Sequence, residues 1–250
     1  MSSPGRVWAS STAASRVGVV TPSPVLTLGD MSTTQAPLPG LDAALIGLAS
    51  LVVVVPQILW PLAEHLNVMA HEGTHAITGS ILGFGIKGVE INPIAEGGTD
   101  YRRPTLGPRR VVTAFVGYLG PSAFGLAAAK LITLGHIIAV LWLAVIFLVL
   151  LLLHLAPPSF GFVSVPVAIA LLYVLTRYAS AGLQVVMAYA MTWVLLLSGV
   201  RVALQDGANA GDADTLTGIT RLPRQLWALL WLAGTLGALY LGVRLLVLRA

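Results

Sequence analysis

Long uncharged stretches dominate the chain from about residue 43 onward. A helix needs about 20 apolar residues, each rising about 1.5 Å, to cross the hydrocarbon core of a bilayer. The stretch 131–176 is too long for one span, and its Pro157-Pro158 and Gly161 favour a turn. The pattern therefore predicts spans near residues 43–63, 66–85, 111–129, 132–154, 162–178, 181–203 and 225–247.

The boundary at Ala179-Ser180-Ala181-Gly182 decides the number of spans. Two helices separated at this point bring the total to seven, whereas one kinked helix lowers it to six. In both cases the backbone satisfies its own hydrogen bonds within helices, as a lipid environment requires. We expect an all-α fold, a polytopic transmembrane helical bundle of six or seven spans.

The composition supports the membrane assignment. Of the 250 residues, 56% are hydrophobic and 10% are charged, and the mean hydropathy is +0.87. A soluble domain carries about 25% charged residues. The absence of cysteine excludes disulfides, thiolate zinc sites, iron–sulfur clusters and thiol catalysis. The net charge of +4 is better explained by membrane topology than by a nucleic-acid partner, and we expect no such partner.

The chain divides into a polar start and an apolar remainder. Residues 1–40 are rich in Ser, Thr, Pro and Gly and contain no apolar core long enough for a signal peptide. We expect a flexible N-terminal tail at 1–40, or a start codon assigned ahead of the real one. Residues 41–250 then form one membrane-embedded domain.

Two linkers interrupt the apolar pattern. The first, 86–110, begins with alternating apolar and polar residues and continues with glycines and Pro93, which predicts a short hairpin at 86–101. The second, 204–224, carries three aspartates. Arginine and lysine are concentrated in and beside these linkers, so the positive-inside rule places both in the cytoplasm.

One group of ionisable residues lies inside a predicted span. His71-Glu72-Gly73-Thr74-His75 fits His-Glu-x-x-His, and residues four apart share one face of a helix. Both imidazoles can therefore bind one metal ion, while Glu72 can take the proton of an activated water. The alternative is that these side chains form hydrogen bonds between helices. Three ionisable groups in five residues of a span favour the metal site.

A zinc site needs a third protein ligand. Outside the motif, His136 and His154 lie near opposite ends of one predicted span and are better explained as structural residues. The acidic candidates follow the sixth predicted span, where small residues suit a turn that re-enters the membrane. A solvated acidic loop is the alternative interpretation. These candidates are Asp206, Asp212 and Asp214.

Several other short segments accompany the motif. They are Ala70–Ala76 with Gly79, Gly97–Thr99, Gly117–Pro121, Trp193–Arg201, Asp212–Leu216, Thr220–Pro223 and Trp227. With His-Glu-x-x-His in the second span of a polytopic protein, their order resembles the site-2 protease family of intramembrane zinc metallopeptidases. More narrowly, it is similar to the compact bacterial subgroup of that family. The motif is the specific element, and the other segments add weight through their order and spacing.

This resemblance implies a zinc metalloendopeptidase that hydrolyses peptide bonds in or next to transmembrane segments. His71 and His75 would bind Zn²⁺, and Glu72 would be the general base. By position the third ligand would be Asp212, with Asp214 in reserve. The better-studied members carry this ligand in an Asn/Pro-rich Asp-Gly motif, whereas the Asp-Gly here, at Asp206, lacks those neighbours.

The resemblance also implies the surroundings of the protein. We expect a multi-pass protein of a bacterial cell membrane, with a lipid bilayer around it and a membrane protein as substrate. In such proteases the hairpin after the zinc helix can hold the substrate as an added strand. A linker that only sets the topology is the alternative for 86–101.

Two other functions compete with proteolysis. A non-proteolytic metal-binding membrane protein, a transporter or sensor, would need polar groups along a path through the bundle. The fourth, fifth and seventh predicted spans offer almost none. A structural or chaperoning protein that has lost its activity would not need both histidines and the glutamate of the motif.

Overall fold

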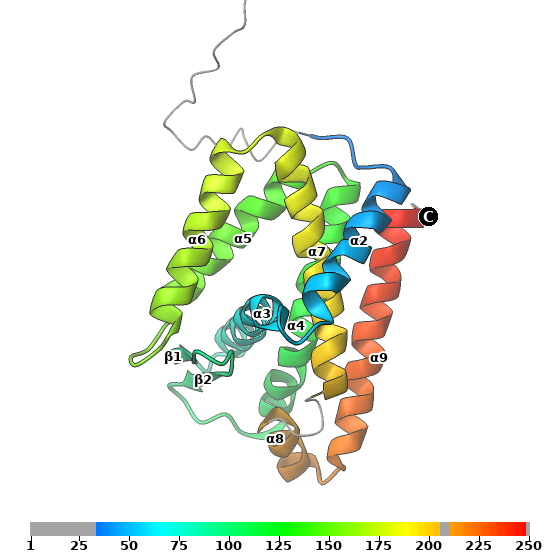
Figure 1. Cartoon of the computed structure of the whole chain (residues 1–250). Coiled ribbons are helices and arrows are strands. Elements are labelled where there is room, and N and C mark those ends of the chain that lie inside the picture. The colour runs from blue at the N-terminus through cyan, green and yellow to red at the C-terminus, as the bar shows by residue number, and fades with distance from the viewer. Residues whose placement is uncertain (1–33, 206–210, 249–250) are drawn as a thin grey trace, which may run out of the picture.

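The computed structural model describes residues 34–205 and 211–248, which form a mostly helical structure with one small sheet (Figure 1). The elements are α2 (Gly40–Val54), α3 (Trp60–Ile81), β1 (Ile86–Ile91), β2 (Gly97–Tyr101), α4 (Gly107–Thr133), α5 (Ile137–Leu152), α6 (Gly161–Tyr178), α7 (Ala181–Gln205), α8 (Gly211–Thr220), α9 (Arg224–Val243) and the short π-helix η1 (Arg244–Leu248).

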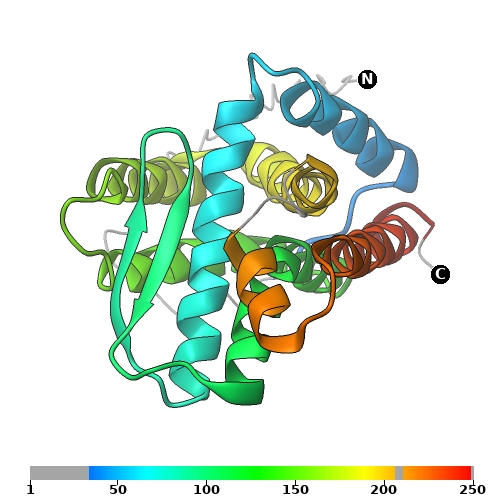
Figure 2. The ribbon, with the colours of Figure 1, turned by 90° about the horizontal axis from the view of Figure 1, so that it is seen from below.

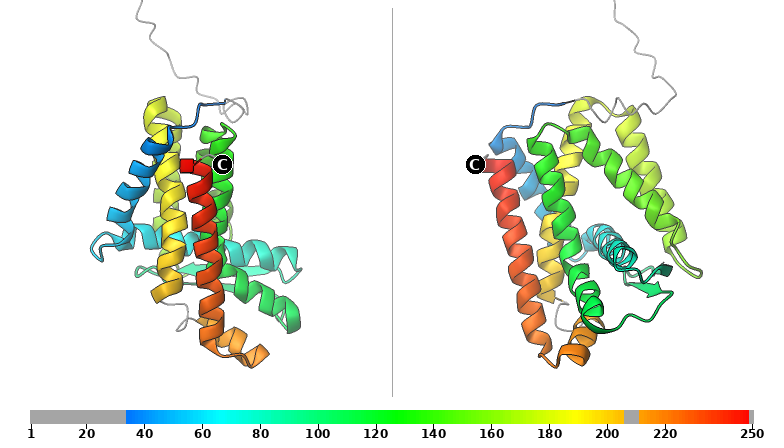
Figure 3. Two further views of the ribbon diagram at one scale, coloured as in Figure 1. Left: turned by 90° about the vertical axis from the view of Figure 1, so that its right-hand side faces the viewer. Right: turned by 180° about the vertical axis from the view of Figure 1, so that it is seen from behind.

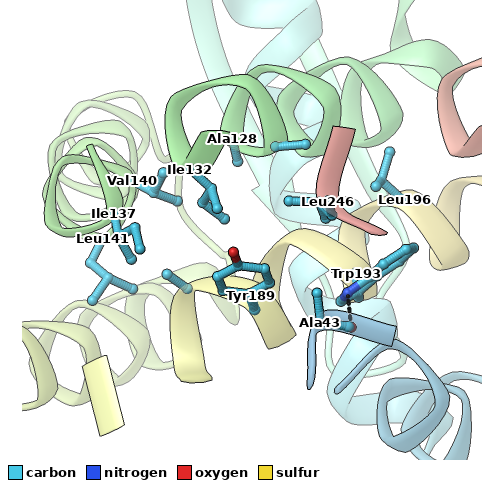
Figure 4. Close-up of a cluster of buried hydrophobic side chains, with 12 residues drawn as sticks. Ala43, Ala128, Ile132, Ile137, Val140, Leu141, Tyr189, Trp193, Leu196 and Leu246 are labelled. Carbon is cyan, nitrogen blue, oxygen red and sulfur yellow. Dashed lines mark hydrogen bonds between the residues drawn. The ribbon is translucent and has the colours of Figure 1, made fainter. Parts of the chain in front are cut away.

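Helices α4, α7 and α9 lie side by side, and α2 packs on α7 (Figures 1 and 3). Their side chains meet in an apolar cluster around Tyr189, Trp193 and Leu196 of α7 (Figure 4). The indole Nε1 of Trp193 donates to the Ala43 carbonyl at 3.0 Å and so joins α7 to α2. These contacts join α2, α4, α7 and α9 into one packed group of helices.

Four helices are long and apolar enough to cross a membrane, by length and composition, in the part of the chain that the structure describes. They are Gly107–Thr133, Gly161–Tyr178, Ala181–Gln205 and Arg224–Leu248, each close to a predicted span. Two further apolar helices, Gly40–Val54 and Ile137–Leu152, are shorter. Large apolar side chains such as Leu171 and Leu229 are exposed on these helices, which is typical of a surface that faces lipid.

The segment predicted as the first span, 43–63, contains a break. Helix α2 ends at Val54, because Pro56 has no N–H with which to continue the hydrogen-bond ladder. Arg201 of α7 donates to the carbonyls of Val54 and Val55, and its guanidinium lies 4.0 Å from the ring centroid of Trp60. Arg201 therefore supplies hydrogen-bond donors to the carbonyls at the end of α2 and packs on the first residue of α3 through a cation–π contact.

The motif helix α3 crosses the direction of its neighbours. It is seen nearly end-on in Figure 1 and lengthwise in Figure 2, whereas α7 and α9 change the opposite way. By length and composition it is not among the four candidate spans, and it covers Trp60–Ile81 where the sequence predicted a span at 66–85. That α3 crosses a membrane stays a prediction. Hydropathy reports how apolar a segment is, but not the angle at which its helix crosses the neighbouring helices. For α3 this angle is set by contacts with α4, β2 and α7.

The predicted break at 179–180 separates two helices, since α6 ends at Tyr178 and α7 begins at Ala181. In the predicted span 132–154, helix α5 begins only at Ile137, because Gly135 adopts φ 83° in the turn that follows α4.

Strands β1 and β2 form a two-stranded antiparallel sheet in which Val89 lies opposite Thr99. The outer edge of β1 is occupied: the Val89 N–H donates to the His154 carbonyl at 2.8 Å, and Ala156 N–H donates to the Val89 carbonyl at 2.9 Å. Because the N–H and C=O of Val89 are both directed away from β2, Val89 and Thr99 form a non-hydrogen-bonded pair. The Thr99 N–H and C=O therefore point away from β1. The cytoplasmic location of this sheet stays a prediction.

The predicted tail at 1–40 lies mostly outside the described residues. The described part, 34–39, contacts the helices: the Gln35 N–H donates to the Gly135 carbonyl, and the Leu38 N–H donates to the Tyr189 hydroxyl. The division of the chain at residue 40 stays a prediction.

Candidate metal centre

Two histidines on one face of α3 bring their Nε2 atoms together. His71 and His75 lie one helical turn apart, and their Nε2 atoms are 3.0 Å from each other. The spacing of four residues explains this approach, because it returns the chain to the same face. Both side chains are largely withdrawn from solvent.

Asp212 completes the group from the first turn of α8. Its Oδ2 lies 3.2 Å from the His71 Nε2 and 3.1 Å from the His75 Nε2. Burial alone would raise the pKa of Asp212, but hydrogen bonds with both histidines and the attraction of their charges together outweigh burial and hold that pKa well below its ordinary value. The three side chains offer one ligand atom each, all within 4.8 Å of one another, and could hold a metal ion.

The other two aspartate candidates differ from Asp212. Asp214, two residues further along α8, forms an ion pair with Arg224 at the start of α9 and is half exposed. Asp206 lies outside the described residues. His136 and His154 do not belong to the His71–His75–Asp212 group, and the His154 Nδ1 is hydrogen-bonded to the Leu150 carbonyl.

Helix α4 supplies the wall behind the histidines. A Cβ atom on Gly117 would overlap the His75 Nε2 and would lie 2.9 Å from the His71 Nε2. Tyr118 packs its ring edge-on against His71, with centroids 5.0 Å apart, and Trp231 of α9 stacks on Tyr118 at 4.2 Å. The absence of a side chain at 117 therefore leaves room for both imidazoles, and the aromatic stack limits the movement of His71.

Glu72 points from α3 toward β2 and is only 3% exposed. The Thr99 hydroxyl donates to the Glu72 Oε2 at 2.7 Å. A Cβ atom on Gly97 would lie 2.9 Å from the Glu72 Oε1, so a glycine is needed where the strand passes this carboxylate. The sheet thus fixes the Glu72 side chain beside the His71–His75–Asp212 group.

Tyr101, at the end of β2, anchors the strand to α3. Its hydroxyl donates to the His75 carbonyl at 3.3 Å, and its ring fills the space beside Gly79. Burial, together with the charges of Glu72 and Asp212, raises the pKa of Tyr101 above its ordinary value. The phenol is therefore neutral and remains a hydrogen-bond donor.

A cavity of about 1140 Å³ opens beside these groups and reaches the His71–His75–Asp212 atoms. Figure 2 shows its surroundings: the sheet lies on one side of α3 and α8 on the other. The cavity wall includes the whole of β2, the connection that follows it, and the start of α8. An extended chain lying along β2 would therefore pass the three candidate ligands.

Three contacts of the site have no signal in local sequence patterns. They involve Thr99, Gly117 and Tyr118, which belong to segments noted for their order but carry no motif of their own. Each contact joins α3 to an element more than 25 residues away, so a search of neighbouring positions could not find it.

Comparison with known families matches residues 44–242 to the family described as peptidase M50B-like. The matched range includes the motif helix, the sheet and α8. Comparison with curated proteins and with solved structures gave no match. The match covers most of the chain and agrees with the His-His-Asp group and the apolar helices. The chain therefore belongs to the peptidase M50B-like family, the site-2 protease family of membrane metallopeptidases.

Proposed function

We propose that this protein is an intramembrane zinc metalloendopeptidase that hydrolyses peptide bonds in or next to transmembrane segments. The observation that carries the proposal is the group of His71, His75 and Asp212 with Glu72 beside it. In this proposal the first three residues bind Zn²⁺ and Glu72 is the general base. Residues 41–250 form the membrane-embedded metallopeptidase domain, and the substrate is another membrane protein in the same bilayer.

The spacing of the three ligand atoms supports zinc. Tetrahedral Zn²⁺ with ligands at about 2.0–2.1 Å has ligand atoms about 3.3 Å apart. The three distances here are 3.0, 3.1 and 3.2 Å. Two imidazoles and one carboxylate are a ligand set that zinc accepts, and a catalytic site keeps its fourth position open. The donor atoms therefore fit the ion that the family implies.

Replacing Gly117 with alanine is expected to lower zinc affinity by about tenfold or more, because the added methyl group overlaps the His75 ring. Zinc bound by the purified variant at buffered free zinc measures this. Gly237→Ala on α9 is the matched control, since its added Cβ meets no atom within 4 Å. Equal zinc affinity in both variants would contradict the close approach of α4 to the ligands.

The chemistry of the proposed reaction divides between the ion and the chain. When bound, Zn²⁺ would supply a Lewis acid that polarises a carbonyl and lowers the pKa of water. Glu72 accepts a proton from the attacking water and delivers it to the amide nitrogen as the C–N bond breaks. Thr99 holds one oxygen of that carboxylate, which leaves the other oxygen for proton transfer.

The free edge of β2 supports an extended substrate. Gly97 and Thr99 direct N–H and C=O groups away from β1, and in the described part of the chain no backbone group bonds to them. An extended peptide can pair with this edge and expose its carbonyls, which a helical peptide hides in its own hydrogen bonds. Family membership favours this peptidase over a metal-binding transporter or sensor.

Removal and return of zinc test the proposal. Purified protein in proteoliposomes is expected to cleave a fluorogenic peptide joined to a transmembrane segment. Chelation with 1,10-phenanthroline should abolish cleavage, and added Zn²⁺ should restore most of it. A non-chelating phenanthroline isomer controls for effects of the compound on the bilayer. Full activity after complete zinc removal would refute the proposal.

A further inference from the structure

Opposite charges flank the cleft beside the candidate metal centre. Strand β2 runs along α3: Gly97 lies against Val68 and Glu72, and Tyr101 lies against Gly79. Figure 2 shows the strands alongside α3, with the connection from β2 to α4 near the C-terminal end of α3. The cleft therefore has one end near the start of β2 and another end beyond Tyr101.

The two ends differ in charge. Glu64 lies on α3 two turns before the motif, and Glu96 directly precedes β2, so both belong to the first end. Arginines follow β2 and begin α4 at the other end. All of these residues line the cavity, and the arginines are Arg102, Arg103 and Arg110.

Among the residues that the structure describes, none of these five forms an ion pair. The three arginines donate to main-chain carbonyls, and Glu96 accepts from the Asn92 side-chain amide. Asp100 also lines the cavity, but it is paired with Lys87 at 3.5 Å across the sheet. The charges at both ends therefore remain available to a ligand.

We propose that the cleft selects peptides by charge order, with acidic residues N-terminal and basic residues C-terminal to the scissile bond. This inference rests on the proposed function. Antiparallel pairing is the more stable arrangement per residue, so the peptide runs opposite to β2. Its N-terminal part then meets Arg102 and Arg103, and its C-terminal part meets Glu64 and Glu96.

Distances along the elements give the positions of these charges. Glu64 precedes Glu72 by eight residues of helix, or about 12 Å. An extended peptide covers this length in about four residues. At the other end, Arg102 and Arg103 follow Thr99 by three and four residues of chain. The selected charges therefore lie about three to four residues on either side of the scissile bond.

Three peptides that share one transmembrane segment and one cleaved sequence test the charge order. One carries Glu-Glu before and Lys-Lys after the scissile bond, one carries the reverse order, and one is neutral. The first is expected to be cleaved with a kcat/KM about tenfold above that of the reversed peptide at low salt. This ratio should shrink at 1 M salt, where the Debye length is about 3 Å.

Charge reversal in the protein provides the second arm. Arg102→Glu combined with Arg103→Glu is expected to lower or invert the ratio, whereas Lys130→Glu at the other end of α4 should leave it unchanged. Cleavage of all three peptides with equal kcat/KM, or a preference for the reversed peptide, would overturn the charge order and leave the peptidase proposal standing. Failure to cleave even the neutral peptide in the presence of zinc would instead overturn the peptidase proposal, and this inference with it.

Discussion

Replacing Glu72 with glutamine is expected to lower peptide cleavage by about 1,000-fold or more while zinc remains bound. Glutamine has nearly the same shape, and its amide oxygen can still accept the hydrogen bond from Thr99. It cannot take a proton from water, however, and general-base catalysis contributes about 10²–10⁴-fold. Single-turnover cleavage of a model substrate in proteoliposomes measures the loss.

A matched substitution separates this effect from a general loss of structure. Glu90→Gln on β1 makes the same chemical change on an exposed side chain. We expect this variant to retain the activity and the zinc content of the wild type. Wild-type rates in Glu72→Gln would refute the assignment of the base, and loss of zinc from that variant would contradict our placement of Glu72 outside the ligand set.

The sequence predicted the parts of the site that depend on helical periodicity. His71 and His75 share one face of α3 because they are four residues apart, whatever surrounds the helix. The paired strands also lie where alternation and turn residues predicted a hairpin. Apolar length predicted the positions of α4, α6, α7 and α9 closely, because each of these helices is long and uncharged over most of its length.

Features that depend on packing between distant segments differ from the prediction or had no signal. The crossing direction of α3 follows from its contacts with α4, β2 and α7, and the hydropathy of residues 60–81 does not indicate which segments these are. The hydrogen bond from Thr99 to Glu72 joins residues 27 apart. Asp212 approaches His75 from 137 residues away, so only the resemblance to a family distinguished it from Asp214 and Asp206.

Substitution of the proposed third ligand is expected to have the second large effect, on zinc content. Asp212→Ala removes one of three protein ligands. Loss of a residue that only orients a ligand lowers metal affinity by up to about 100-fold, so loss of the ligand itself should lower zinc affinity by more than that. Asp212→Asn keeps the volume and removes the charge, so it should also bind zinc weakly if the carboxylate is the ligand. Metal analysis after equilibrium dialysis gives the bound zinc per chain.

Asp214→Ala makes the same substitution two residues away and is the natural control. Its carboxylate is paired with Arg224 at a half-exposed site, and such pairs contribute little to stability. We therefore expect zinc content and melting temperature close to those of the wild type. If Asp214→Ala lost zinc and Asp212→Ala kept it, the third ligand would be misassigned. If both kept zinc, the third ligand would lie elsewhere, and the contact between α8 and the motif helix would be structural. The paired measurement thus asks whether Asp212 holds the metal or only brings α8 against α3.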